Sequence, residues 1–408
     1  MMKTKVFVVS ALILLCGSIY SQNENVESID IKFGGYVNWT AIYDSRQTVS
    51  LREGHFLLFP SNQLLDSFGN DINAKANFNI LSIQTRLNGK IEGPTTLGAK
   101  TSGMIEAEFF GTSEGDVNGL RLRHAYINFN WGSTALLIGQ TWHPMFITEA
   151  FPQVISFNTG VPFQPFARNP QIRFTQSIGS VNLIAAFLTQ RDFTSNGPQG
   201  YSSAYMRNSA LPESHFQVQY KTNDLIVGTG VDFKILVPRL ETEKKIMTDE
   251  ELKSLSGLFY VKYSLGIFNV IAESVYGENL TDLLMPGGYA VSEKDSTTGI
   301  EKYTNLRAYS LWCDLTYGKD LQAGIFLGFS KNLGSSDKIV DKIYARAENI
   351  SELLRLSPRV QFTAGKLRFA AELEYTQALY GKPDSYGKIN SSTNVDNIRL
   401  LIGTFFFF

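Results

Sequence analysis

The repeated alternation of apolar and polar side chains is the feature that most constrains how this chain folds. In residues 367–377, Phe369 and Leu373 fall on one side of an extended segment, while Glu372 and Glu374 fall on the other. Successive side chains of a β-strand point to opposite faces, so each segment has one charged face that needs water and one face too apolar for water. The same alternation occurs in residues 31–43, 81–90, 99–110, 215–221, 354–363 and 395–408.

Two further segments depart from strict alternation. In residues 120–131, Arg121 and Arg123 have the same parity as the apolar Ile127. Either a β-bulge near Arg123 changes the register, or the two arginines lie above a membrane. In residues 133–140 three apolar residues are consecutive, which suits a strand packed against another subunit or against a folded-in loop.

The lengths of the connections indicate what the apolar faces meet. Short turns are predicted near residues 132–133, 178–180, 222–224, 265–266, 318–319 and 365–366. Long connections are predicted near residues 44–75, 143–171, 192–212, 236–252, 277–302, 332–352 and 380–394. Short turns at one end and long loops at the other are typical of outer-membrane barrels. The sequence therefore predicts an all-β fold, a closed antiparallel transmembrane β-barrel of about 16 strands with short periplasmic turns and long extracellular loops.

The composition agrees with a barrel and argues against a helical membrane protein. Aromatic residues make up 12% of the chain, yet the mean hydropathy is −0.07, because the polar and apolar faces cancel. Beyond the N-terminal region, no apolar run approaches the roughly 20 residues that a transmembrane helix needs. The formal net charge of −1 excludes a strongly basic surface for nucleic acid.

The N-terminus predicts export. A short basic region precedes the apolar run at residues 6–16, and small or polar residues follow it. Cleavage before Gln22 would make residues 1–21 a secretory signal peptide. Lipid attachment at Cys16 is the alternative, but it requires a small residue just before the cysteine, where this chain has Leu15.

Residues 22–408 form one predicted barrel domain. Cys313 is its only cysteine, so no intramolecular disulfide can form, and closure of the barrel must supply the stability. The last strand, residues 395–408, is expected to pair with residues 31–43 to close the barrel. It ends on Phe408, and a C-terminal aromatic residue on the lipid face resembles the signal read by the barrel-assembly machinery of the outer membrane.

The connection at residues 143–171 is stiff and aromatic, with five prolines and five phenylalanines. Such a loop is too apolar for a solvated tip. By count it joins the fifth and sixth strands and is the third external loop. We expect it to fold into the barrel and form a constriction with Arg168 at the narrow point. A loop packed over the barrel mouth or on neighbouring subunits is the alternative.

Charged residues on the predicted inner faces are the candidate pore-lining groups. The basic candidates are Arg86, Arg168, Arg355, Arg359, Arg368 and Arg399, and the acidic candidates are Glu106, Glu108, Glu372 and Glu374. We expect the late arginines to form a basic ladder, with acidic pairs facing them across the lumen. Rings of Arg and Lys in a pore favour anions, whereas carboxylate rings favour cations. The alternatives are carboxylates that only balance arginines, and a wetted wall without selectivity.

Neither a catalytic site nor a metal site is predicted. The chain has only four histidines, and Ser214 and His215 are adjacent, which on a strand sends their side chains to opposite faces. His124 is expected to make a hydrogen bond in the lumenal wall. No spacing of metal-ligating residues suggests a zinc site, so we expect neither a cofactor nor an enzymatic activity.

Several short motifs carry a resemblance to a known family. They are Gly35-Tyr36-Val37-Asn38-Trp39, Arg121-Leu122-Arg123-His124, Gly139-Gln140-Thr141-Trp142 and Phe163-Gln164-Pro165. They resemble the DcaP-like family of trimeric outer-membrane porins, and the resemblance covers mainly residues 31–175. It implies a homotrimer of barrels that passes small, often anionic, solutes. Residues 22–30 are too short for the periplasmic coiled coil that some members carry.

Together, these features predict a porin integral to the outer membrane of a Gram-negative bacterium. Small hydrophilic solutes, anionic solutes among them, are expected to pass by diffusion. The expected partners are outer-membrane lipid and lipopolysaccharide, two further copies of the chain in a homotrimer, and the barrel-assembly machinery. The alternative from another class is an adhesin or structural barrel whose lumen is plugged by the loop at residues 143–171.

Overall fold

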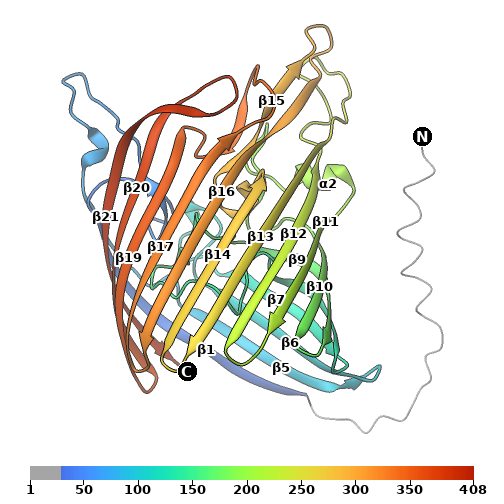
Figure 1. The fold of residues 1–408 in the computed structure, drawn as a ribbon, viewed down its shortest axis with the longest axis vertical. Helices are drawn as coiled ribbons and strands as arrows, with labels where there is room; N and C mark the ends of the chain where they lie inside the picture. Colours follow the sequence, from blue (N-terminus) through green and yellow to red (C-terminus); the bar gives the residue numbers. More distant parts are fainter. Residues whose placement is uncertain (1–28) are drawn as a thin grey trace.

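The computed structural model describes residues 29–408, so the predicted signal peptide lies outside the described residues. The described strands form a closed antiparallel barrel of 16 strands, which confirms the predicted fold class (Figure 1). β4 and β5 both pair with β1 and together make the second barrel strand. The barrel strands are β1 (Asp30–Asp44), β4 (Asn77–Leu81), β5 (Arg86–Thr96), β6 (Ala99–Glu108), β7 (Arg121–Asn130), β8 (Thr134–Trp142), β9 (Arg168–Ile178), β10 (Val181–Leu188), β11 (Glu213–Lys221), β12 (Leu225–Leu236), β13 (Leu252–Leu265), β14 (Phe268–Glu278), β16 (Glu301–Gly318), β17 (Leu321–Gly334), β19 (Ile350–Ala364), β20 (Leu367–Pro383) and β21 (Ile389–Phe407).

Shorter elements lie in the long connections. They are the hairpin of β2 (Thr48–Leu51) and β3 (Phe56–Pro60), the paired strands β15 (Gly287–Lys294) and β18 (Ile343–Arg346), helix α2 (Ala204–Ser209), and the 3-10 turns η2 (Ile72–Ala74), η3 (Glu114–Asp116) and η4 (Thr281–Leu283). Within residues 29–408, no helix combines the length and the apolar character needed to cross a membrane.

The first and last strands close the barrel, as the sequence predicts. β1 pairs with β21 from Tyr36 opposite Phe407 to Asp44 opposite Arg399. The other edge of β1 pairs with β5 at residues 30–36 and with β4 at residues 40–44, so the backbone hydrogen bonding continues around the barrel. Closure matters because an unpaired strand edge within lipid would leave backbone N–H and C=O groups without partners.

The predicted alternation separates an outer face from an inner face. On β21, Ile398, Leu400 and Ile402 are 44–47% exposed on the outside, whereas Asn397 and Arg399, which alternate with them, are fully buried inside. The same outward apolar pattern recurs around the barrel, for example at Phe174, Phe216, Phe259 and Phe369. An apolar belt around a closed barrel is the surface that lipid requires, so the chain is an integral outer-membrane barrel.

The two ends of the barrel differ in the length of their connections. Two-residue or three-residue turns join β7 to β8, β9 to β10, β13 to β14 and β19 to β20, as predicted, and the long connections leave the other end (Figure 1). The prediction of a long loop at residues 380–394 was wrong. β20 and β21 extend beyond the barrel and leave only residues 384–388 between them. A connection that was not predicted, residues 109–120, joins β6 to β7.

The irregular strand at residues 121–130 contains the predicted bulge. Across β6 and β7, Glu106 lies opposite His124 and Ala107 lies opposite Leu122, so Arg123 has no partner in the register. The bulge brings Arg121 and Arg123 to the inner face, where both are buried. The structure therefore shows the β-bulge, and the alternative in which the two arginines lie above the membrane is not observed.

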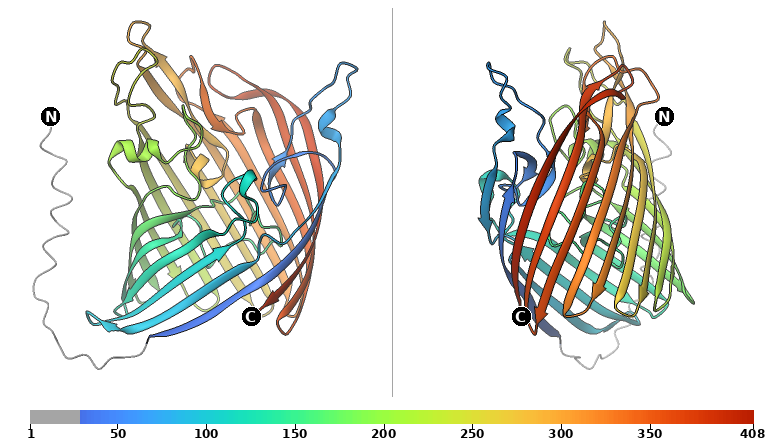
Figure 2. Two further views of the ribbon diagram at one scale, coloured as in Figure 1. Left: turned by 180° about the vertical axis from the view of Figure 1, so that it is seen from behind. Right: turned by 60° about the vertical axis from the view of Figure 1, so that its left-hand side comes forward.

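The wall of the barrel is uneven in height. β16, β20 and β21 have 17–19 residues, whereas β6, β7 and β8 have 9 or 10. Figure 2 shows the tall wall in orange and red and the low wall in blue and teal. Because the long loop after β8 starts from the low wall, it begins deep within the barrel and can cross toward the tall wall.

Candidate pore constriction

The loop at residues 143–167 joins β8 to β9 and lies inside the barrel. It turns tightly at its start, where the Phe146 N–H donates to the His143 carbonyl oxygen at 2.9 Å. The Phe146 ring stacks on the indole of Trp142, the last residue of β8, with the ring centroids 3.9 Å apart. Met145 and Phe163 are fully buried, so the aromatic and proline-rich sequence packs within the lumen and is not solvated.

The first half of the loop is bound by side chains of β13 and β16. Lys262 donates from Nζ to the carbonyl oxygen of Glu149 at 3.0 Å. The backbone N–H of Gln153 donates to the carboxylate of Asp314 at 2.9 Å. These contacts carry the loop away from β8, where it starts, to the other side of the lumen.

The second half of the loop is bound by β19 and β20. The Asn158 side-chain amide donates to Glu374 at 2.9 Å, and Arg355 donates from Nη1 to the carbonyl oxygen of Val161 at 2.7 Å. The Ile155 N–H donates to the Glu372 carboxylate. The Arg355 guanidinium is charged, and a hydrogen bond from a charged donor is stronger than one between neutral groups, so this half of the loop is held firmly in its crossing path.

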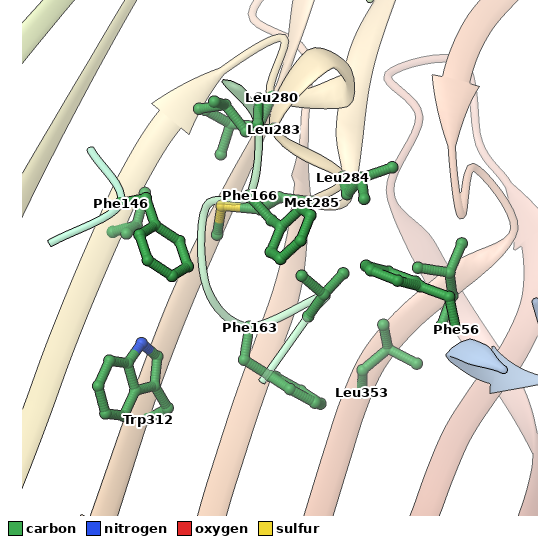
Figure 3. Packing of buried hydrophobic residues seen from close by; sticks show 14 of the residues in the cluster. Phe56, Phe146, Phe163, Phe166, Leu280, Leu283, Leu284, Met285, Trp312 and Leu353 are labelled. Atoms are coloured by element: carbon green, nitrogen blue, oxygen red, sulfur yellow. The ribbon is translucent and has the colours of Figure 1, made fainter. Parts of the chain in front are cut away.

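Two other segments enter the extracellular half of the lumen beside this loop. Arg355 donates from Nη2 to the Leu58 carbonyl oxygen at 2.8 Å, which holds the β2–β3 hairpin against the wall. The Phe166 N–H donates to the Leu283 carbonyl oxygen at 3.0 Å, which joins the loop to residues 279–286. Buried side chains of these segments, of the loop and of the adjacent wall strands form one apolar group, the lumenal core (Figure 3). It includes Phe56, Leu58, Phe146, Phe163, Phe166, Leu280, Leu283, Leu284 and Met285 from the segments and Trp312 and Leu353 from the wall.

A group of charged residues, the Glu108 cluster, lines the low wall next to the loop. Glu108 is fully buried and lies 2.6 Å from Arg121, 2.7 Å from Arg123 and 3.0 Å from Arg86. The other members of the cluster are Glu106, which is 2.7 Å from Arg123, and the pair of Arg168 and Asp192, which are 2.6 Å apart. Four arginines and three carboxylates therefore share one side of the lumen.

Asp192 lies in the loop after β10, outside the barrel strands, and its charge depends on these arginines. Burial raises its pKa, but the guanidinium groups of Arg168 and Arg121 outweigh burial and hold the pKa below its usual range. Asp192 is therefore ionised at neutral pH, and its ion pair with Arg168 ties the end of the in-folded loop to the next extracellular loop.

A second group of charges, the seam cluster, lies on the tall wall and across the β1–β21 seam. Arg359 is 2.7 Å from Asp314, Arg399 is 2.7 Å from Asp44, and Glu374 is 3.6 Å from Arg355. All six side chains are buried on the inner face. Glu372 lies on the same wall, directly opposite Arg359 in the register of β19 and β20.

The predicted separation of charge across the lumen was wrong. Glu372 and Glu374 lie on β20, between the arginines of β19 and Arg399 of β21, so acidic and basic groups are neighbours on one wall. Arg86, Glu106 and Glu108 are likewise neighbours on the opposite wall. Charges this close together on adjacent strands neutralise one another directly, as the alternative of balanced arginines supposes. Arg368 stands apart from both clusters, with its guanidinium 5.2 Å from the centre of the Phe407 ring.

The architecture is shared with known channels of the outer membrane. No protein-family model matches the sequence, and no curated protein matches it. Among solved structures, the channel DcaP of Acinetobacter baumannii has a TM-score of 0.69, with 15% identity over 93% of this chain and 97% of that chain. The chain has the fold of an outer-membrane porin. The resemblance to DcaP-like porins is thus confirmed as a likeness of fold.

Other outer-membrane proteins share this fold at a lower level of similarity. OmpT of Vibrio cholerae has a TM-score of 0.54, with 12% identity over 94% of this chain and 98% of that chain. An anion-selective porin from Comamonas acidovorans also has a TM-score of 0.54, with 10% identity over 93% of this chain and 100% of that chain. At these identities the match concerns the fold.

On the side of the short turns, the in-folded loop forms the roof of a cavity, the vestibule, of about 890 Å³. Its wall is aromatic and polar, with Tyr36, Trp142 and Phe405 beside Gln322 and Gln361. The charged residues among its described lining are Arg86, Glu106, Arg123, Arg173, Lys319 and Arg368. Leu137 also faces this space, while its neighbour Ile138 is exposed on the outside, which explains the consecutive apolar residues of β8.

Several residues of the two clusters were not among the sequence candidates. They are Asp44, Arg121, Arg123, Asp192 and Asp314. Arg121 and Arg123 were not candidates because the bulge changes which face of the strand their side chains lie on. Asp192 lies in a loop, where no alternation predicts the direction of a side chain. Asp44 ends β1 with the inward parity of Thr40 and Ile42, so the alternation could have identified it.

Proposed function

We propose that the chain is a porin and not an enzyme, and that small hydrophilic solutes diffuse through it past the loop at residues 143–167. The observation that supports this best is the path of that loop. It starts at the low wall and is bound by Asp314 and Arg355 of the tall wall, so it spans the lumen at a fixed position. A loop held across the lumen in this way narrows the pore and sets an upper limit on the size of the solutes that pass.

We also propose that anions pass more readily than cations. Five basic residues and the single carboxylate of Glu106 are the charged groups of the described vestibule lining. Glu106 is already paired with Arg123, whereas Arg368 and Lys319 form no ion pair with any carboxylate of residues 29–408. An excess of positive charge in a narrow space raises the local concentration of anions. The name of the porin from Comamonas acidovorans, which describes it as anion-selective, agrees with this proposal.

The assembly that we propose is a homotrimer surrounded by outer-membrane lipid and lipopolysaccharide. One structure of OmpT of Vibrio cholerae is described as a trimer form. The match between the two structures covers 94% of this chain and 100% of that OmpT chain. The low wall of β6–β8 presents a short apolar outer face that would pack against another subunit. We further propose that the barrel-assembly machinery recognises β21.

A plugged structural barrel or adhesin is the second candidate, and one observation favours it. The loop at residues 143–167, the β2–β3 hairpin and residues 279–286 share the lumenal core, so the extracellular half of the lumen is packed with apolar side chains. In a porin these segments must leave a path beside them or move. In a plugged barrel they would stay in place.

Swelling of liposomes that contain the purified full-length chain separates the two candidates. For the porin we expect rapid swelling in small uncharged sugars, slower swelling as the sugar becomes larger, and faster swelling in a small organic anion than in an uncharged solute of equal size. Liposomes that contain heat-unfolded protein serve as the control. If folded protein produces no swelling with any of these solutes, the barrel is plugged and the porin proposal is wrong.

A further inference from the structure

Three side chains that can ligate a metal ion meet where the in-folded loop begins. His143 is the first residue after β8, Glu213 begins β11, and Asp232 lies on β12. His143 Nε2 is 3.1 Å from Glu213 Oε1 and 3.8 Å from Asp232 Oδ2. One ligand atom from each residue lies within 4.8 Å of the other two, and all three residues are at most 3% exposed. The absence of a zinc-like spacing in the sequence is therefore misleading, because the fold brings together residues that are far apart in the chain.

Within residues 29–408, neither carboxylate of this group forms an ion pair with a lysine or an arginine. Lys234 lies on the same strand as Asp232, but it pairs with Asp282 of the η4 turn. Glu213 is 1% exposed, yet its Oε2 atom has no hydrogen-bond partner. A buried carboxylate oxygen without a donor is costly, and a bound cation removes that cost.

We propose that His143, Glu213 and Asp232 bind a divalent transition-metal ion of the Zn²⁺ type. An imidazole nitrogen with two carboxylate oxygens is a donor set that such ions accept, with a fourth position left for water. In a tetrahedral Zn²⁺ site the ligand atoms lie about 3.3 Å apart, and the two distances from His143 Nε2 lie on either side of that value. His215, with Nδ1 3.3 Å from Asp232 Oδ2, is placed to orient that carboxylate.

Binding of the ion is linked to the backbone of the loop through the His143 ring. The Met145 N–H donates to Nδ1 at 3.1 Å, so the proton of the neutral ring is on Nε2, where it faces Glu213. A metal ion on Nε2 needs the lone pair of that nitrogen, so the ring proton moves to Nδ1 and the hydrogen bond from Met145 is lost. The ion therefore fixes the ring to β11 and β12, while the turn loses the hydrogen bond from Met145 and keeps the one from Phe146 to the His143 carbonyl oxygen.

A metal-free arrangement would explain the same contacts differently. Glu213 and Asp232 would share one proton between them, and the Nε2–H of His143 would donate to Glu213. In that case the group is a neutral hydrogen-bonded support of the loop and has no affinity for metal. The two arrangements differ in whether a metal ion binds, which is measured without reference to conduction.

Titration of EDTA-treated, full-length protein in detergent with Co²⁺ and then Zn²⁺ tests the site. We expect one Co²⁺ per chain with the visible absorption of a low-symmetry nitrogen–oxygen site, displaced by Zn²⁺. His143→Gln and Asp232→Asn should each weaken binding by at least about tenfold. His124→Gln is the matched control, because His124 is also a buried histidine beside a carboxylate, 3.7 Å from Glu106, and it should bind metal as the wild type does.

Two results would overturn the site. The first is wild-type protein that binds no Co²⁺ at 100 µM ion, a result that does not depend on any variant being folded. The second is variants that keep the mobility of the folded barrel on unheated gels and bind metal with unchanged affinity. Neither result bears on whether the barrel conducts solutes, so the site and the porin proposal fail separately.

Discussion

Arg355 donates a 2.7 Å hydrogen bond to the carbonyl oxygen of Val161, and this bond joins the tall wall of the barrel to the loop that crosses its lumen. The same guanidinium donates to the Leu58 carbonyl oxygen at 2.8 Å and so holds the β2–β3 hairpin as well. One buried side chain of β19 thus fixes two of the three segments that fill the lumen. The stability of the constriction is expected to depend on it.

Arg355→Met should loosen both segments. Each lost hydrogen bond from a charged group is worth about 1.5–3 kcal/mol, so hydrogen exchange in residues 143–167 should be at least tenfold faster. Mass-spectrometric hydrogen exchange measures this by peptide. Arg207→Met, in the exposed part of helix α2, is the control and should leave the exchange of the loop unchanged. Equal exchange in wild type and Arg355→Met would contradict the role given to Arg355.

The ion pair between Asp44 and Arg399 should stabilise closure of the barrel. Arg399→Met leaves the Asp44 carboxylate buried without its cation, which should lower the free energy of unfolding by about 3–5 kcal/mol. The double variant Asp44→Asn with Arg399→Met should recover part of that loss, because the uncompensated charge is gone. Urea unfolding in detergent, followed by intrinsic fluorescence, measures both.

The control for the seam is a pair on the surface. Lys302 and Glu293 lie 2.8 Å apart but are exposed to water, so Lys302→Met should leave the urea midpoint unchanged. If Arg399→Met has as little effect as Lys302→Met, the seam pair does not stabilise closure.

His55 should make the packing of the β2–β3 hairpin dependent on pH. It lies between the two strands of the hairpin, outside the barrel strands, and is 1% exposed. Burial, and then the charge of Arg399, lower its pKa to about 4. The folded hairpin therefore holds neutral His55, and its stability is complete above a pH of about 6.5, the pKa of an exposed histidine. It falls as the pH decreases toward 4, by a total of about 3 kcal/mol.

Hydrogen exchange in residues 48–60, corrected for the intrinsic effect of pH, measures this loss. Protection should decrease between pH 6.5 and pH 4.5 in the wild type. In His55→Phe the dependence should disappear, because no group titrates at that position. Protection that is constant over this range in the wild type would show that protonation of His55 does not open the hairpin.

The basic residues of the vestibule should determine the preference for anions. Replacing Lys319 and Arg368 together by Gln removes two positive charges from the cavity lining without touching either charge cluster. The reversal potential in a tenfold KCl gradient should move toward that of a non-selective pore. Lys245→Gln is the control, since Lys245 is exposed in an extracellular connection and should not affect selectivity. A reversal potential unchanged by the double replacement would exclude the vestibule as the selectivity determinant.

The barrel could be predicted from the sequence because its signal is local. Phe369 and Glu372, three positions apart, already lie on opposite faces of a strand whatever that strand pairs with. The loop at residues 143–167 was identifiable for a similar reason, since its phenylalanines need burial wherever they lie. The β2–β3 hairpin has the same kind of signal in Phe56-Leu57-Leu58-Phe59, although only a long connection is predicted at residues 44–75.

The pairing of charges could not be predicted, because it depends on register and bulges. Whether Glu374 faces Arg355 across a pore or lies beside it depends on which strands are neighbours and how they are aligned. The bulge at Arg123 moves two arginines onto Glu108, a contact that strict alternation forbids. His143 follows β8, Glu213 begins β11 and Asp232 lies on β12. Only the folded barrel brings these three residues together.

Single-channel recording of the purified wild-type protein in a planar lipid bilayer tests the central proposal most directly. A trimeric porin predicts insertion events that each add three equal conductance levels, together with closing in thirds at high voltage. Protein that inserts into the bilayer as folded barrel but carries no current at any voltage would contradict it. The three in-folded segments would then be a permanent plug.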